Sequence, residues 1–280
     1  MKLLRPAVAL IALAACTPAL HQGPAPAGGA AVDASRLAAH VQTLASDAFM
    51  GRGPATPAEP MTVDYLVAQL QAAGVAPGGD NGTWYQEVPL NQSDIVGTPA
   101  LSVTVNGQVH ALVQGEQVAI RASMQNVDRV DIRNAPLVFL GYGVKAPERN
   151  WDDFKGQDLR GKVGIVLVND PDFETGQGDF GGKAMTYYGR WTYKYEEAAR
   201  QGLAGMLVVH ETEPASYGWA TVKNSNTNTM FDIVRANPAE VHPLLEGWVQ
   251  REDAVRLFAA VGENFEQLKR LAQTREFRPV

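Results

Sequence analysis

The chain has 280 residues, of which 45% are hydrophobic and 19% charged, and its formal net charge is −6. This length allows a substantial core or two domains, and the composition is that of a folded protein. A nucleic-acid-binding protein needs a basic face, so the negative charge argues against that class of partner.

The N-terminal residues are predicted to lie outside the fold. A short basic region precedes an apolar run over residues 7–15, which is too short for a mature membrane span but suits a signal peptide over residues 1–15. The run ends in Leu-Ala-Ala-Cys, which resembles the bacterial lipobox. We therefore expect a lipid anchor on Cys16, in the outer membrane of the cell envelope and facing the periplasm, followed by a flexible tether over residues 16–32. The alternative is a signal peptide cleaved elsewhere. Cys16 is the single cysteine, so no internal disulfide can form.

Two amphipathic helices are predicted next, over residues 33–45 and 62–73. Apolar residues recur at helical spacing in both, and Asp33 can cap the first helix. Gly74 follows the second helix, where a left-handed C-cap is favoured. A turn and a strand over residues 83–90 are expected after it.

A β-rich part follows these helices. Asn106-Gly107, the strongest short hairpin signal, separates predicted strands at residues 102–105 and 108–113, and residues 117–120 form another. A change from helices to strands indicates that one structural unit gives way to another near residues 90–120.

Three short apolar runs rich in β-branched residues predict buried strands at residues 137–140, 163–168 and 206–209. A helix over residues 191–201 lies between the last two, so these strands are expected to be parallel neighbours. The loop at 170–190 contains five glycines and several aromatic residues. Loops this long inside a compact unit are commonly functional, and the aromatic residues argue against disorder.

The C-terminal region is predicted to contain a strand, a loop and helices. The expected elements are a strand over 216–222, a solvated loop over 224–229, helices over 239–251 and 253–261, and a helical stripe of Phe265, Leu268 and Leu271. The final Phe-Arg-Pro-Val has the extended pattern of the beginning of a strand.

Two segments carry motifs of a known family. The first is His40-Val41-Gln42-Thr43-Leu44-Ala45-Ser46-Asp47-Ala48-Phe49-Met50-Gly51-Arg52-Gly53, continuing to Pro77-Gly78-Gly79. It resembles the opening of bacterial zinc aminopeptidases of metallopeptidase family twenty-eight, except that Pro54-Ala55-Thr56-Pro57 stands where that family prefers Gly-Thr. The second comprises Val138-Phe139-Leu140-Gly141-Tyr142-Gly143, Trp151-Asp152-Asp153-Phe154 and Met185-Thr186-Tyr187-Tyr188-Gly189-Arg190-Trp191. It resembles the protease-associated (PA) domain inserted in that family.

The resemblance implies an α+β fold, with a helical lead-in and C-terminal helices around a β-rich PA-like domain. The implied parts are a lead-in over 33–115, a PA domain over 116–235, and helices over 236–280 that lead back to a catalytic domain. The family's α/β catalytic domain uses two zinc ions to release N-terminal residues from peptides. Its ligand motifs, a His-x-Asp and a Glu-Glu pair among them, are expected beyond this chain.

The residues themselves show no catalytic group of this kind. None of the five histidines stands in His-x-Asp: His40 is expected to be packed, His110 to face solvent and His242 to start a helix. His210-Glu211-Thr212-Glu213 could ligate a metal, but no second histidine follows at helical spacing. Neighbouring Glu196 and Glu197 point about 100° apart on a helix, so a solvated face is expected. The acidic pairs at Asp152-Asp153 and Asp170-Pro171-Asp172, and Asp179, suit turns and caps better than a calcium site.

Two functions remain open from the sequence. The first is the N-terminal and PA portion of a secreted zinc aminopeptidase, inactive alone, with no catalytic residue or metal ligand of its own. In that case the long loop is a candidate for the substrate entrance, through Lys183, Tyr187, Tyr188, Arg190 and Trp191. The second is a stand-alone PA-type lipoprotein that binds a peptide or protein without catalysis.

Overall fold

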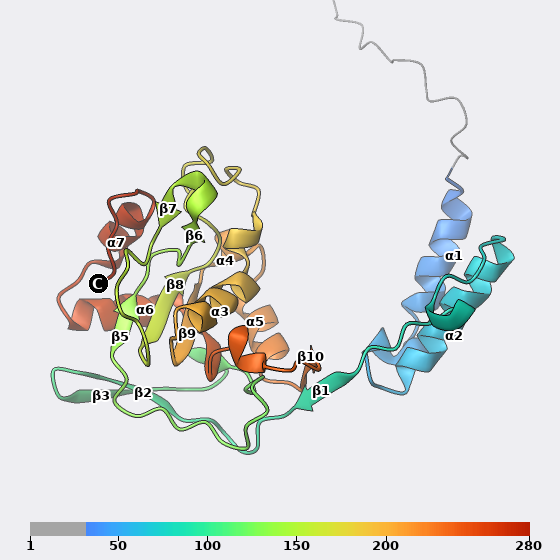
Figure 1. The fold of residues 1–280 in the computed structure, drawn as a ribbon, viewed down its shortest axis with the longest axis horizontal. Helices are drawn as coiled ribbons and strands as arrows, with labels where there is room; N and C mark the ends of the chain where they lie inside the picture. Colours follow the sequence, from blue (N-terminus) through green and yellow to red (C-terminus); the bar gives the residue numbers. More distant parts are fainter. Residues whose placement is uncertain (1–31) are drawn as a thin grey trace, which may run out of the picture. The chain divides into compact units, whose positions relative to one another are not determined.

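The computed structural model describes residues 32–280, which fall into one unit ending at Tyr85 and another formed by Gln86–Val280 (Figure 1). Helices are combined with parallel and antiparallel strands, so the predicted α+β class is confirmed. The predicted signal peptide and Cys16 lie outside the described residues, as does nearly all of the tether. Within the described part, no helix has the length and apolar character needed to cross a membrane.

The first unit contains two helices, α1 (Ala34–Leu44) and α2 (Ala58–Ala72), joined by a 3-10 segment (Asp47–Arg52). Asp33 caps α1 as predicted, because its carboxylate accepts hydrogen bonds from the backbone N–H groups of Ser35 and Arg36. The start predicted for α2 is wrong by one turn. Pro60 lies in the first turn of the helix, where its missing N–H has no helical partner.

Tyr65 of α2 ties the first unit together. Its hydroxyl lies 2.7 Å from Nδ1 of His40, which is packed as predicted, and its ring meets Phe49 edge-on at 5.8 Å. Between them, however, the two helices bury only one residue, Ala58. The unit therefore has little core of its own.

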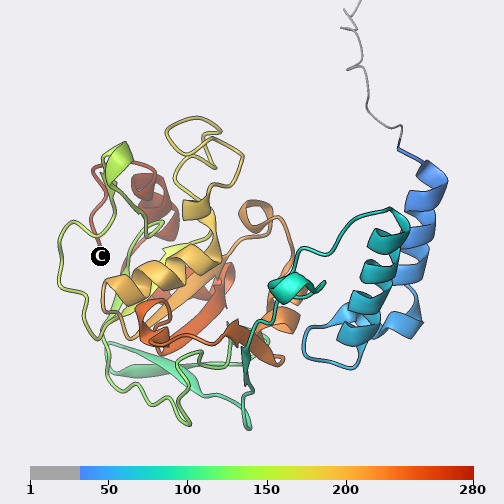
Figure 2. The same ribbon diagram turned by 45° about the vertical axis from the view of Figure 1, so that its right-hand side comes forward.

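The second unit begins with two small antiparallel pairs. Strand β1 (Leu90–Ser93) pairs with β10 (Met230–Ile233), and β2 (Leu101–Val105) pairs with β3 (Gln108–Leu112) around the predicted Asn-Gly turn (Figure 2). Both turn residues have positive φ, 50° and 79°, as a type I′ turn requires. The predicted strand over 83–90 is wrong except for Leu90. Backbone bonds from Gly79 to Thr83 and from Asp80 to Tyr85 fold that segment into turns instead.

A five-stranded sheet forms the centre of the second unit, with strand order β4-β11-β9-β8-β5. Its members are β4 (Val118–Ile120), β5 (Leu137–Phe139), β8 (Val163–Leu167), β9 (Gly205–His210) and β11 (Leu245–Gln250). The last four are parallel and β4 is antiparallel. The strands predicted at 137–140, 163–168 and 206–209 correspond to β5, β8 and β9, so they are confirmed, as is the parallel pairing of β8 with β9.

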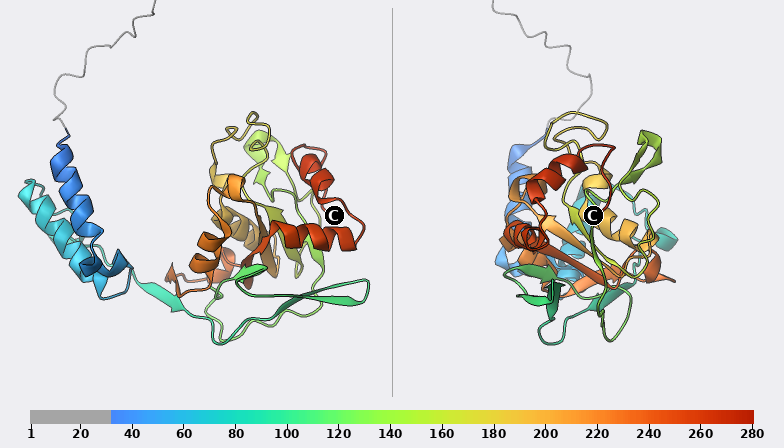
Figure 3. Two further views of the ribbon diagram at one scale, coloured as in Figure 1. Left: turned by 180° about the vertical axis from the view of Figure 1, so that it is seen from behind. Right: turned by 90° about the vertical axis from the view of Figure 1, so that its left-hand side faces the viewer.

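Helices cover both faces of this sheet (Figure 3). They are α3 (Trp191–Arg200) and α5 (Trp219–Asn226) on one face, and α6 (Arg251–Ala260) and α7 (Phe265–Ala272) on the other. Successive side chains of β8 point to opposite faces of the sheet and so contribute to a hydrophobic core on each face. Ile165 belongs to the same core as Leu257 of α6, whereas Val166 belongs to the same core as Tyr195 of α3. The short helix α4 (Thr212–Ala215) follows β9.

Three C-terminal predictions are wrong. The helix expected over 239–251 is replaced by β11, which lies between β4 and β9, where Gly247 lets the backbone of Ala119 approach closely. In place of the strand expected over 216–222, Ser216 adopts a left-handed conformation that ends α4, and residues 219–222 form the first part of α5. The loop expected over 224–229 begins inside α5, where Asn226 is buried and donates to the carbonyl of Val222.

The last residues close the outer edge of the sheet. Phe277 is fully buried, with its ring 5.7 Å from that of Phe139. Phe139 and Val280 exchange two backbone hydrogen bonds of 2.7 and 3.1 Å, which is the pattern of an antiparallel pair. The extended conformation predicted for this segment is therefore present at the edge strand β5.

Candidate functional site

The long loop at 170–190 projects from the end of β8 and is held by its own carboxylates (Figure 1). Asp170 accepts hydrogen bonds of 3.0 and 2.9 Å from the backbone and hydroxyl of Thr186, and Asp172 accepts one from the backbone of Phe180. The Phe180 ring is fully buried. These bonds span 16 and 8 residues, so the two carboxylates connect distant parts of the loop instead of forming the turns and caps predicted for them.

A buried lysine anchors the end of this loop. Lys194 of α3 is fully buried, and its Nζ donates to the carbonyl oxygens of Tyr142, Asn169 and Tyr188 at 2.6, 2.9 and 2.6 Å. Burial lowers the pKa of Lys194, and the charge of nearby Asp153 opposes that shift. The three carbonyls come from three separate segments, so one ammonium group fixes the loop to the sheet.

Two of the predicted entrance residues, Tyr187 and Tyr188, pack edge-on against the ring of Tyr193, at 5.6 and 5.0 Å, whereas Lys183 has other partners. Lys183 lies over the Phe173 ring, with Nζ 4.1 Å from the ring centre, and 3.6 Å from a carboxylate oxygen of Glu213. The Tyr187 hydroxyl donates to Glu196 at 2.7 and 2.6 Å. The Tyr188 hydroxyl donates to Glu148 at 2.8 Å.

The other two predicted residues differ in their surroundings. Arg190 is exposed at the N-terminus of α3. Trp191 is half-buried beneath the Arg121 guanidinium, which lies 5.3 Å from its ring centre, and it lines a cavity. Trp191 thus lies beside a defined cavity, and a joint entrance role for all five residues stays a prediction.

This cavity, here called the His242 pocket, has a volume of about 230 Å³ and is lined by residues from α3, β10 and the segments before β11 and after β4. Those used below are Arg121, Trp191, Phe231, Asp232, Arg235 and His242. Arg121 and His242 are far apart in the sequence. They lie close together because β4, which precedes Arg121, pairs with β11, which follows His242.

His242 lies between two carboxylates. Its Nδ1 is 2.7 Å from Oε1 of Glu246 and its Nε2 is 3.1 Å from Oδ2 of Asp232. Burial disfavours the charged ring, but the hydrogen bond to Glu246 and the charges of Glu246 and Asp232 outweigh it, so the pKa of His242 is raised. A protonated imidazole donates from both nitrogens, which fits two acceptors. The predicted helix start at His242 is wrong, since β11 follows.

Two arginines extend this arrangement into a charged chain, Arg121–Glu246–His242–Asp232–Arg235. Arg121 is buried, with its Nη1 3.3 Å from Oε2 of Glu246, and among residues 32–280 its Nε has no hydrogen-bond partner. Arg235 lies 3.0 Å from Asp232 at the pocket wall. With His242 protonated, these five side chains comprise three positive and two negative groups. Sequence reasoning missed it because these residues share no motif or regular spacing.

The other histidines and acidic pairs have structural roles. His210 is buried and lies 3.0 Å from the carbonyl oxygen of Tyr217, while Glu211 pairs with Lys269 at 2.8 Å. Glu197 of α3 is only 4% exposed and pairs with Arg200, so the solvated face predicted for it is wrong. Across residues 32–280, no group of three or more His, Cys, Asp or Glu side chains is arranged to hold a metal ion.

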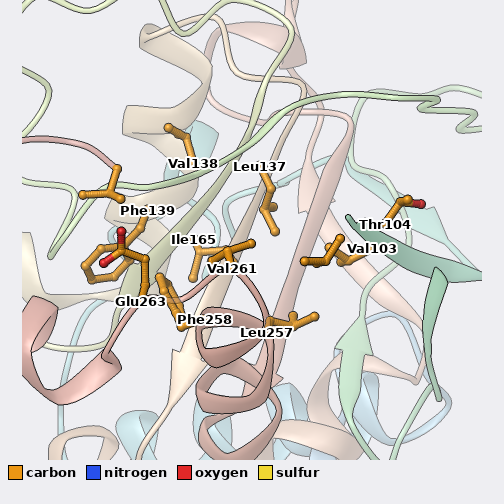
Figure 4. Close-up of a pocket in the computed structure, with 12 residues that line it drawn as sticks. Val103, Thr104, Leu137, Val138, Phe139, Ile165, Leu257, Phe258, Val261 and Glu263 are labelled. Carbon is orange, nitrogen blue, oxygen red and sulfur yellow. The ribbon is translucent and has the colours of Figure 1, made fainter. Parts of the chain in front are cut away.

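A second cavity of about 390 Å³ lies between β5, the β2–β3 hairpin and α6 (Figure 4). The side chains of Val103 (β2), Leu137 (β5), Ile165 (β8), Leu257 (α6) and Val261, which follows α6, turn toward this space. Its lining is mainly apolar, with Thr104 and Glu263 as the polar side chains. It can accept an apolar group, but it offers no paired acid and base for catalysis.

Comparison with known proteins gives limited information. No family model matches the chain, and no curated protein matches it. One similar solved structure is the aminopeptidase from Aneurinibacillus sp. strain AM-1, with 16% sequence identity and a TM-score of 0.31. The match covers 75% of this chain, which spans 37% of the length of that protein. A similarity of this size carries no argument about function, so the functional assignment depends on the residues themselves.

Proposed function

We propose that this chain is the N-terminal and PA-like portion of a secreted zinc aminopeptidase that removes N-terminal residues from peptides by metal-activated water. The proposal is supported by the motifs at 40–53 and 138–191, which occur in the order that the family resemblance implies. In this proposal the chain alone is inactive, its substrate is a peptide, and a lipid on Cys16 anchors it to the outer membrane, facing the periplasm.

The observation that carries this proposal is the apolar surface of the first unit. Leu37 and Val41 of α1 are 56% and 59% exposed, and Leu66 and Leu70 of α2 are 46% and 43% exposed. Helices in folded proteins gain most of their stability by burying such a face against another body. In the proposed enzyme, the catalytic domain covers these residues.

Zinc would have to be held elsewhere in the full protein. A two-metal centre needs imidazole and carboxylate ligands that converge on ions about 3.5–4 Å apart. Residues 32–280 contain no such donor group, so they do not fit the metals and no step of hydrolysis is assigned to them. Their proposed contribution is to position the long loop, with Lys183, Tyr187, Tyr188, Arg190 and Trp191, beside the peptide.

The test compares two purified proteins. One is this 280-residue chain, and the other is the longer product encoded when the reading frame is continued past codon 280. Hydrolysis of an aminoacyl p-nitroanilide is measured with added zinc and with a chelator. We expect no turnover by the 280-residue chain, and chelator-sensitive turnover by the extended protein. Chelator-sensitive turnover by the 280-residue chain would contradict the proposal, because it would place metal ligands within these residues.

A stand-alone PA-type binding lipoprotein is the second candidate. It is favoured by the second unit, whose sheet carries a helix-covered core on each face and therefore does not need a further domain. A reading frame that stops at codon 280 would support it. A frame that continues with a His-x-Asp and a Glu-Glu pair would support the aminopeptidase.

A further inference from the structure

We propose that the His242 pocket is a binding site for a single carboxylate carried by a group about the size of one amino-acid residue. This goes beyond the proposed function, since the pocket belongs wholly to the second unit and its binding is independent of any catalytic domain.

The cation that favours an anion in this pocket is Arg121. Its guanidinium forms an ion pair with Glu246 at 3.3 Å, and among residues 32–280 its Nε has no hydrogen-bond partner. The other charged groups of the lining are engaged already: carboxylates hold His242 and Arg235, and Glu196 shares Arg200 with Glu197. A charge enclosed by protein is screened less than one on the surface, so an anion that reaches Arg121 interacts with it strongly.

The unused donors lie on the arginines. Both nitrogens of His242 are engaged by carboxylates, so the imidazole contributes its charge and no free donor. The Arg121 guanidinium is 7% exposed, carries five N–H donors, and makes one 3.3 Å ion pair with Glu246. Burying a guanidinium whose N–H donors lack acceptors costs free energy, unless a ligand supplies those acceptors. Arginine is also the side chain best suited to hold a carboxylate through two parallel bonds.

The walls of the pocket limit the size of the ligand. Trp191 and Phe231 provide aromatic surface beside the arginines. The volume of about 230 Å³ is below the roughly 300–1,000 Å³ of pockets that hold drug-sized ligands. The arrangement fits a carboxylate next to one apolar side chain, as at the C-terminus of a peptide. An aspartate side chain within a peptide is the other source of the same group.

Isothermal titration of the purified chain tests this with three small probes: N-acetyl-leucine, N-acetyl-leucinamide and N-acetyl-aspartic acid α-amide. We expect N-acetyl-leucine to bind at least about tenfold more tightly than its amide, because a charge-assisted hydrogen bond contributes about that factor. Tighter binding of N-acetyl-leucine than of the aspartate probe assigns the site to peptide C-termini, and the reverse order assigns it to acidic side chains. Equal binding of acid and amide, or no binding of either acid, overturns the proposal.

Variants locate the site. Arg235→Gln should weaken N-acetyl-leucine binding severalfold, whereas Arg133→Gln, which removes a similar but more exposed Arg–Asp pair, should not. Arg121→Gln could leave Glu246 buried without its cation, so the double variant Arg121→Gln/Glu246→Gln is used. A folded double variant should lose the preference for acid over amide, and an unchanged preference overturns the assignment.

The pH dependence adds an independent readout. The groups facing His242 are Asp232 and Arg235 on the β10 side, Glu246 of β11, Arg121 after β4 and Glu196 of α3. Loss of the His242 proton removes one positive charge from the pocket lining. The affinity for N-acetyl-leucine should therefore fall as pH rises through the raised pKa of His242, and His242→Gln should abolish this dependence. A wild-type affinity that is constant from pH 5.5 to 8.5 contradicts the role given to His242.

Discussion

Lys194 donates a 2.6 Å hydrogen bond to the carbonyl oxygen of Tyr188, six residues earlier in the sequence. The bond joins the first turn of α3 to the end of the long loop, and the same ammonium reaches the segments that follow β5 and β8. A fully buried amino group thus fixes the position of the long loop that the sequence predicts.

Replacing Lys194 by methionine should destabilise the second unit by about 3 kcal/mol, because three buried carbonyl groups lose their donor and each unsatisfied group costs about 1 kcal/mol or more. Urea unfolding monitored by tryptophan fluorescence measures the change. Lys145→Met, at an exposed position, serves as the control and should differ from wild type by less than about 0.5 kcal/mol. Equal stability of the two variants would show that Lys194 does not anchor the loop.

The ion pairs of His242 should make stability depend on pH. Because the folded pKa of His242 is raised above 6.5, its stabilisation is fully present below about pH 6.5 and is lost as pH rises through the folded pKa. The wild-type advantage over His242→Gln should therefore shrink by an amount on the order of 1 kcal/mol between pH 6 and pH 9, after allowance for solvent screening. His110→Gln, on the hairpin, provides the control. A constant difference across this range would contradict the pairing.

Gly143 in the Gly-Tyr-Gly motif should not tolerate alanine. Its φ is +61°, and an added Cβ would lie 2.7 Å from Cγ1 of Val166. We expect Gly143→Ala to cost about 2–3 kcal/mol, from backbone strain and overpacking together. Gly161 has a similar φ of +74° with open space around it, so Gly161→Ala should cost about 1 kcal/mol. Thermal unfolding of both variants separates the cost of backbone strain from the cost of overpacking. Equal losses of stability in Gly143→Ala and Gly161→Ala would rule out the clash with Val166.

Phe277 should be essential to the closed edge of the sheet. Its buried ring packs on Phe139, so Phe277→Ala should cost about 3–5 kcal/mol by leaving a cavity. Leu271→Ala removes a side chain that is 41% exposed and should cost less than half as much. Hydrogen exchange at the backbone of Phe139 should also accelerate in Phe277→Ala. Unchanged protection there would mean that the pairing with Val280 does not depend on the ring.

The candidate site was less predictable than the fold. Local composition predicts the long loop and includes Trp191 among its candidate residues, and Trp191 lines a cavity in the structure. The bond from Thr186 to Asp170 joins residues 16 positions apart, so local composition does not predict it. The sequence predicts a helix start at His242, because Pro243 and the apolar and charged residues after it fit a helical pattern. What decides its role is Glu246, which faces it from a buried strand whose neighbours, β9 and β4, are distant along the chain.

The sequence by itself determined the Asp33 cap and the Asn106-Gly107 turn, which arise from contacts within a few residues. It also determined the crossover from β8 through α3 to β9, because two apolar strand patterns on either side of one helix favour parallel pairing. Only the tertiary structure decided that residues 245–250 form a strand, because its backbone bonds are made to β4 and β9 rather than along its own segment. The same pairing brings Arg121 beside Glu246 and so creates the charged chain. Short-range patterns record local propensity, whereas a buried ion network exists only once distant segments have met.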